Sequence, residues 1–136
     1  MKKNPVIHFE LPFADKDRAA AFYEKAFGWK VQMLGPEMGE YVIVQTGDTD
    51  EKGMLEKPGM INGGMYKKTK DDQHPSIVIA VDDIHEAMKM VTGAGGTVIG
   101  GSQGVDKPDA IPGVGLFAAF IDSEGNRGAI LQPNER

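Results

Sequence analysis

The stretch VIHFELPFADKDRAAAFYEKAFGWKV, residues 6–31, decides the fold of the first half of this chain. Apolar residues occupy every second position over Val6–Leu11, a period that predicts a β-strand with one set of side chains on each face. A helix is predicted over Asp15–Phe27, because apolar residues recur there at helical spacing and Asp15 can accept hydrogen bonds from first-turn N–H groups. Gly28 is placed to end this helix, since glycine adopts the left-handed conformation without steric penalty.

The predicted strand carries two polar residues on the same face. Ile7, Phe9 and Leu11 share one face, and His8 and Glu10 fall on the other. A histidine and a carboxylate two residues apart are suited to binding or acid–base chemistry if their face lines a cavity, and have no such role if it faces solvent.

Length and composition bound the kind of protein. The chain has 136 residues, of which 40% are hydrophobic and 26% charged, so we expect one globular domain spanning residues 1–136. A net charge of −5 argues against nucleic acid or an anionic membrane as a partner. The absence of cysteine excludes disulfides and thiolate metal sites, and no signal peptide or membrane span is recognisable, so a cytoplasmic location is expected.

The second half repeats the plan of the first. PSIVIAVDD, residues 75–83, predicts a strand, and a helix from Asp83 to about Ala94 follows, with Asp83 and Glu86 at capping-box spacing. Asp15 and Asp83 lie 68 positions apart, as do Gly28 and Gly96. Further strands are predicted at about 29–34, 41–46 and 60–67 in the first half, and at 97–101, 113–122 and 126–133 in the second. The pattern predicts an α+β fold of two tandem βαβββ units, about residues 5–67 and 75–133.

Four segments together resemble the vicinal oxygen chelate superfamily, which includes glyoxalase I, bleomycin-resistance proteins and extradiol dioxygenases. They are HFELPFADKDRAAAFYEKAFGW (8–29), INGGMYK (61–67), IAVDDIHEAMKMVTGAGGTV (79–98) and IPGVGLFAAFIDSEGNRGAILQP (111–133). The nearest resemblance is to the uncharacterised branch related to lactoylglutathione lyase. It implies curled mixed sheets around a cleft, helices on the convex faces, and His8 and Glu10 directed into the cleft.

The resemblance also implies where metal ligands would stand. Metal-dependent members take them from the first and last strands of each unit, which correspond here to His8, Gly63 or Gly64, Ser76 and Ala129. Only the histidine can bind a metal, whereas a catalytic zinc site needs about three protein ligands. We therefore expect no metal and no cofactor.

The expected partner is a small-molecule ligand. If Glu10 lies close to His8, the carboxylate should raise the pKa of the imidazole, which would suit a small anionic or polar ligand. The residues expected to contact the ligand are His8, Glu10, Asn62, Tyr66, Ser76 and Phe117.

Three classes of function remain open at this point. The first is a metal-free protein that binds a small molecule, and the second a metal-dependent lyase or isomerase of lactoylglutathione lyase type. The third is a structural or regulatory dimer whose cleft is incidental. A homodimer is expected in any case, because short open sheets leave edge strands that partners cover. The sequence names neither the ligand nor any reaction.

Overall fold

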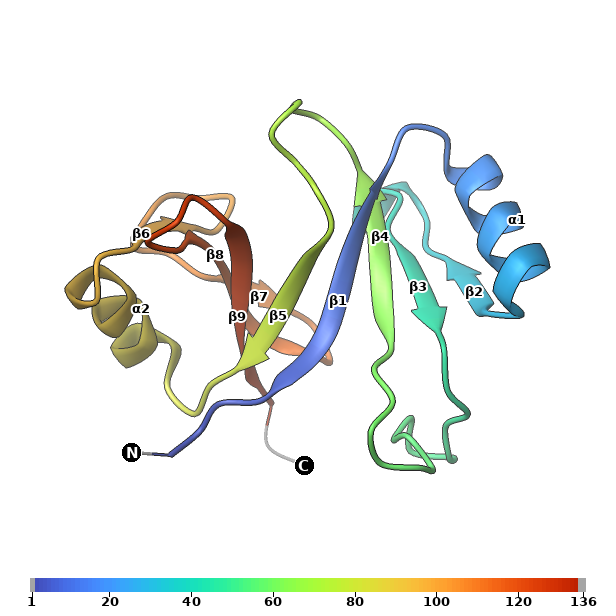
Figure 1. Ribbon diagram of the computed structural model, residues 1–136, viewed down its shortest axis with the longest axis horizontal. Coiled ribbons are helices and arrows are strands. Elements are labelled where there is room, and N and C mark those ends of the chain that lie inside the picture. The colour runs from blue at the N-terminus through green and yellow to red at the C-terminus, as the bar shows by residue number, and fades with distance from the viewer. Residues whose placement is uncertain (1, 135–136) are drawn as a thin grey trace. The chain divides into compact units, whose positions relative to one another are not determined.

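The computed structural model describes residues 2–134, which divide into two compact units (Figure 1). The N-terminal unit comprises residues 8–75. The C-terminal unit comprises residues 76–134 together with the segment before His8, whose Pro5 carbonyl accepts a hydrogen bond from the Ala80 N–H at 2.9 Å. The fold is the α+β arrangement that the sequence predicted, with a strand, a helix and further strands in each half.

The N-terminal unit places one helix on one face of a mixed sheet. Its elements are β1 (Val6–Phe13, from His8 on), α1 (Lys16–Phe27), β2 (Lys30–Met33), the short 3₁₀ helix η1 (Pro36–Met38), β3 (Val42–Gln45) and β4 (Gly63–Lys67). The strands lie in the order β2-β3-β4-β1, with β1 and β4 parallel and the other pairs antiparallel.

Both ends of α1 lie where the sequence predicted. The Asp15 carboxylate accepts a hydrogen bond from the Arg18 N–H at 3.0 Å, and Gly28 adopts a left-handed φ of 70°. The apolar stripe of the helix covers a core of Phe13, Val42, Val44 and Met65, joined by the half-buried Phe9, Leu11, Ala19, Tyr23, Trp29 and Val31.

The C-terminal unit repeats this plan with one addition. Its elements are β5 (Ser76–Ala80), α2 (Ile84–Gly93), β6 (Thr97–Gly100), β7 (Asp109–Ile111), β8 (Gly115–Ile121) and β9 (Arg127–Pro133). The strand order is β5-β9-β8-β6, with β5 and β9 parallel and β7 paired to β8. The short strand β7 was not predicted, because DAI is too brief to show a period.

The helix of this unit begins as the repeat predicts but ends one residue differently. The Asp83 carboxylate accepts a hydrogen bond from the Glu86 N–H at 3.1 Å, as its counterpart Asp15 does in the first unit. The left-handed glycine after α2 is Gly95, with φ of 101°, and Gly96, which lies 68 positions after Gly28, follows it. The core beneath α2 contains Val81, Ile84, Met88, Ala118 and Ile130.

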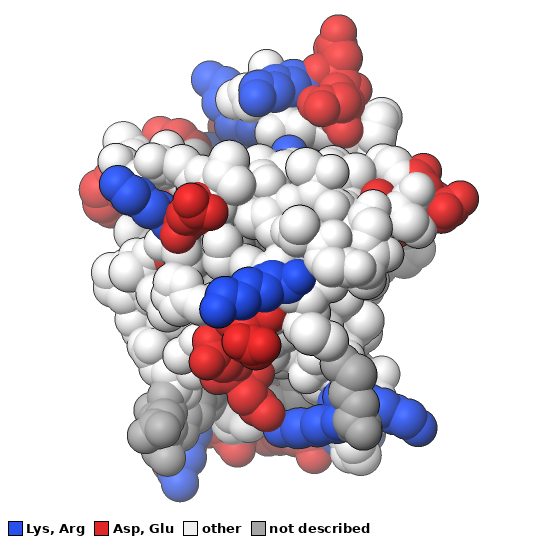
Figure 2. Space-filling model, turned by 90° about the vertical axis from the view of Figure 1, so that its left-hand side faces the viewer, with Lys and Arg blue, Asp and Glu red and all other residues white. Residues whose placement is uncertain are grey.

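No helix within residues 2–134 combines the length and hydropathy that a membrane-spanning helix requires. Charged side chains of both signs are interspersed on the face shown in Figure 2, which has no continuous basic stripe of the kind that binds nucleic acid.

Candidate functional site

Strand β1 divides its side chains between two environments. Phe9, Leu11 and Phe13 pack into the core beneath α1, so His8 and Glu10 emerge on the opposite face. This confirms the predicted alternation of the strand. We call the surface on the side of this sheet opposite α1 the helix-free face.

A tyrosine joins the two polar residues of β1 on the helix-free face. The Tyr41 hydroxyl lies 3.1 Å from His8 Nε2 and donates a hydrogen bond to Glu10 Oε2 at 3.2 Å. His8, Tyr41 and Glu10 are all half-buried. These three residues form what we call the polar cluster, and it lies entirely within the N-terminal unit.

The backbone before β3 positions Tyr41. Gly39 and Glu40 are both left-handed, with φ of 66° and 62°, and the Tyr41 carbonyl accepts a hydrogen bond from the Leu34 N–H at 2.9 Å. A left-handed conformation is unfavourable for glutamate, and such strain is typical of functional segments. Glu40 also pairs with Lys16 in the first turn of α1, which ties this strained turn to the helix.

A glycine makes room for the tyrosine. Gly64 of β4 lies in register with Glu10 of β1, and therefore on the helix-free face. A Cβ atom built on Gly64 would meet the Tyr41 hydroxyl oxygen at 1.8 Å, far below contact distance. The space in which a side chain at position 64 would begin is therefore occupied by the Tyr41 hydroxyl.

Burial sets the protonation states of His8 and Tyr41. It lowers the pKa of His8 below its usual 6.5, so the imidazole is neutral at physiological pH. Burial also raises the pKa of Tyr41, and the neighbouring Glu10 carboxylate raises it further, so the phenol stays protonated. The expectation that Glu10 would raise the pKa of His8 was wrong, because Tyr41 lies between the two groups and desolvation dominates.

The other expected contact residues of the N-terminal unit have distinct surroundings. The Asn62 side-chain oxygen accepts hydrogen bonds from the backbone N–H groups of Thr46 at 2.8 Å and Gly47 at 3.1 Å, which closes the end of β3. Tyr66 lies in register with Pro12 and so shares the helix-free face with His8 and Glu10. The structure therefore gives Asn62 a structural role in the fold and leaves Tyr66 beside the polar cluster.

The corresponding face of the C-terminal unit carries an apolar cluster. Phe117 packs against Val78, Ala129 and Leu131, on the side of the sheet away from α2. Its neighbour in the pattern, Phe120, packs beneath α2 instead. The two phenylalanines therefore occupy opposite faces. Ser76, the half-buried first residue of β5, belongs to this unit.

The residues at the family's metal positions do not fit a metal ion. Position 64 has no side chain and its space is filled by Tyr41, while Ala129 is 2% exposed within an apolar cluster. Within residues 2–134, no three His, Asp or Glu side chains are grouped closely enough to hold a metal. His74 and His85 are both exposed on other elements.

Tyr41 is the member of the cluster that sequence reasoning missed. The sequence predicts Tyr41 within a strand at about 41–46 and gives it no role. The alternation of side chains along that strand was the available signal, because Tyr41 and Ile43 share the face opposite Val42 and Val44. The turn that brings its hydroxyl to His8 leaves no such periodic signal.

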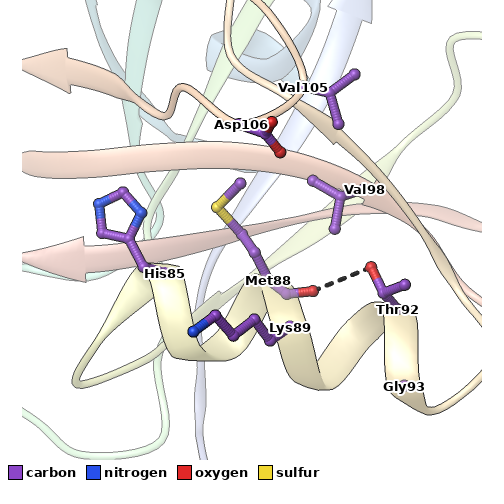
Figure 3. A pocket seen from close by; sticks show the side chains of 8 residues that line it. All are labelled: His85, Met88, Lys89, Thr92, Gly93, Val98, Val105 and Asp106. Atoms are coloured by element: carbon purple, nitrogen blue, oxygen red, sulfur yellow. Dashed lines mark hydrogen bonds between the residues drawn. The ribbon is translucent and has the colours of Figure 1, made fainter.

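A hollow lies within the C-terminal unit, between α2 and the loop that follows β6 (Figure 3). It has a volume of about 500 Å³. The Met88 side chain extends from α2 toward Val98 and Val105, and His85, Lys89 and Asp106 lie around it. Thr92 and Gly93 complete its lining near the end of the helix, where the Thr92 hydroxyl donates a hydrogen bond to the Met88 carbonyl at 3.3 Å.

Comparisons with known proteins agree with this architecture. The family described as bleomycin resistance protein-like N-terminal matches residues 6–47. A glyoxylase-like domain-containing protein of Didymella fabae is 32% identical over 125 residues, covering 89% of this chain and 88% of that protein. The lactoylglutathione lyase of rice is 29% identical over 128 residues, which cover 89% of this chain but 42% of the rice protein, so the chain spans less than half of that relative.

The likeness extends to solved structures. A methylmalonyl-CoA epimerase of Streptomyces coelicolor superposes with a TM-score of 0.69 at 14% identity, covering 98% of this chain and 100% of that one. At this identity the match shows the fold alone. The 32% identity to the Didymella fabae protein, over most of both chains, shows that this chain belongs to the vicinal oxygen chelate superfamily of glyoxalase and bleomycin-resistance proteins.

The first prediction concerns the contact between Gly64 and Tyr41. Gly64→Ala should destabilise the protein by about 1–3 kcal/mol, because the new methyl group overlaps the tyrosine hydroxyl. Gly93→Ala is the matched control, since a Cβ there meets nothing within 4 Å. Urea unfolding measures both. In a Tyr41→Ala background, Gly64→Ala should lower the free energy of unfolding by less. An equal loss in both backgrounds would show that Gly64 and Tyr41 are not in contact.

The second prediction concerns pH. The pKa of His8 is lower in the folded protein than the usual 6.5, so protonation favours the unfolded state. The stability that depends on neutral His8 should be present above about pH 6.5 and decline as the pH falls toward the lowered pKa. The melting temperature should therefore drop more between pH 7.5 and pH 5.5 in the native protein than in His8→Gln. Equal drops would show that His8 is not desolvated.

Proposed function

We propose that this chain binds a small molecule against the helix-free face of its N-terminal unit, without the metal ion of its family. The observation that carries the proposal is the Tyr41 hydroxyl, which occupies the space beside Gly64 and bridges His8 and Glu10. A half-buried group of hydrogen-bonded polar side chains on a strand is expensive to desolvate, and such groups are typical of binding sites. The contact residues proposed are those of the polar cluster with Tyr66, all within the N-terminal unit. Ligand contact by Ser76 and Phe117 of the C-terminal unit stays a prediction from the sequence.

A fragment screen tests whether this face binds. Backbone and tyrosine NMR signals of residues 8–10, 41 and 66 should shift with at least one class of small fragment. The signals of α2 around Met88 report binding in the hollow of the C-terminal unit and serve as the internal comparison. If fragments shift only the signals around Met88, the helix-free face is not the site.

The prediction that the protein binds no metal follows from the residues at the family's metal positions. Purified protein should carry no stoichiometric divalent metal, and added zinc, nickel or iron should barely change its melting temperature. A genuine site at 100 times its dissociation constant would stabilise the folded protein by about 2.7 kcal/mol. Elemental analysis yielding about one metal per chain, lost on His8→Ala, would overturn the metal-free proposal.

The alternative is a metal-dependent lyase or isomerase of lactoylglutathione lyase type. The sequence identity of 29% to the rice lactoylglutathione lyase favours it. An assay of that lyase activity, with and without added nickel or zinc, separates the two: activity that depends on metal supports the alternative, and the metal-free proposal expects none.

We further propose a homodimer and a cytoplasmic location. On the outer side of α1, Phe22 and Phe27 are 55% and 63% exposed with their ring centroids 6.1 Å apart, which favours coverage by a second copy. Strand β2 is also the unpaired edge of its sheet within this unit. Sedimentation equilibrium at micromolar concentration should give twice the chain mass of 14.7 kDa. Phe22→Glu should shift the equilibrium toward monomer, and a monomeric native protein would refute the proposal.

A further inference from the structure

We infer that the ligand of the helix-free face presents a hydrogen-bond donor, an ammonium or a hydroxyl group, which His8 Nδ1 accepts, and that anions are disfavoured. This inference rests on the proposed function of the same face. It narrows the expectation of a small anionic or polar ligand to a polar ligand that donates a hydrogen bond.

The first step is to determine which atoms of the polar cluster carry hydrogen. Tyr41 has one hydroxyl hydrogen, which it donates to Glu10 Oε2. The contact between His8 Nε2 and the Tyr41 oxygen therefore requires the histidine to donate. A neutral imidazole carries a single N–H, so with Nε2 protonated, Nδ1 holds a lone pair and can only accept.

The second step is access to Nδ1. The structure gives this nitrogen no protein partner within residues 2–134. Over the same residues, no buried side-chain nitrogen or oxygen lacks a hydrogen-bond partner. Since Nδ1 has none and His8 is only half-buried, the nitrogen is not sealed from solvent, and a ligand can reach it.

The third step is the charge around this acceptor. The groups that share the face are Glu10 on β1, Tyr41 before β3, Tyr66 on β4 and Lys30 on the edge strand β2. Lys30 lies three strands from β1, whereas the Glu10 carboxylate belongs to the cluster itself. An ammonium group gains from both the lone pair and the carboxylate, a hydroxyl group gains from the lone pair, and a carboxylate is repelled by both.

The accepting state of Nδ1 disfavours anions as well. An anion needs a hydrogen-bond donor, and with Nε2 protonated the Nδ1 atom of His8 has no hydrogen to donate. The tyrosine adds to the effect by fixing the tautomer, because its oxygen must receive the Nε2 hydrogen. Tyr41 is thus a positioning residue that acts through His8.

The first measurement reads the tautomer directly. Long-range ¹H–¹⁵N NMR of His8 at pH 7.5 should show a protonated Nε2 and an unprotonated Nδ1. In Tyr41→Phe, which lacks the accepting oxygen, the preference for this tautomer should weaken. A protonated Nδ1 in the native protein would overturn the inference, even if the fragment screen shows that the face binds.

The second measurement compares four probes of nearly equal shape: benzylamine, benzyl alcohol, benzyl methyl ether and benzoate. Benzylamine, which is cationic at pH 7.5, should bind tightest. Benzyl alcohol should bind about fivefold more tightly than its methyl ether, which cannot donate, given the usual strength of a neutral hydrogen bond. Benzylamine and benzyl alcohol should both shift the Nδ1 resonance of His8. The difference between their affinities shows whether the site prefers an ammonium or a hydroxyl donor.

Variants assign the preference to His8. His8→Phe should abolish the difference between the alcohol and the ether while retaining binding of the ether, and the exposed-site control His85→Phe should leave the difference unchanged. Benzoate binding as well as benzylamine, equal binding of alcohol and ether, or no shift of His8 Nδ1 with any probe would each overturn the inference. The proposed function fails separately, when no fragment of any class moves the signals of the face.

Discussion

The alternation of side chains along β1 is the constraint on which the rest of the N-terminal unit depends. Phe9, Leu11 and Phe13 are committed to the core beneath α1. Because successive residues of a strand point to opposite faces, this commitment forces His8 and Glu10 onto the other side. A slip of one residue in register would bury a histidine and a carboxylate under the helix, at a cost that no contact there would offset.

On the face so defined, a tyrosine occupies the space that a metal-binding side chain would need. Gly64 is one of the two positions, with Gly63, that the family resemblance matches to a metal ligand, and the Tyr41 hydroxyl lies where the Cβ of a side chain at position 64 would project. The tyrosine hydroxyl connects His8 to Glu10 through two hydrogen bonds of 3.1 and 3.2 Å. In this arrangement His8 is a neutral imidazole whose Nε2 atom donates to the tyrosine oxygen.

The two halves of the chain share a scaffold and differ in the chemistry of corresponding faces. Asp15 and Asp83 cap their helices in the same way, through a carboxylate that accepts from the N–H three residues on. At the positions of His8 and Glu10, however, the second half has Ser76 and Val78, and Val78 is 1% exposed among Phe117, Ala129 and Leu131. Helix caps and core periodicity thus tolerate wide variation on the opposite face of the sheet, which is how one fold can serve unrelated sites.

What the sequence determined by itself was the part of the structure that depends on local periodicity. The strands other than β7, both helices with their N-caps and the side of β1 occupied by His8 follow from patterns that span fewer than about 20 residues. The repeat of two units follows from the recurrence of these patterns 68 positions further along the chain. The tertiary structure alone decided the site. Tyr41 lies 33 positions from His8, and only the left-handed turn at Gly39 and Glu40, together with the missing side chain of Gly64, brings its hydroxyl between His8 and Glu10. The direction of the His8 pKa shift was likewise hidden, because desolvation depends on groups packed around the ring, and these come from strands that are distant in the sequence.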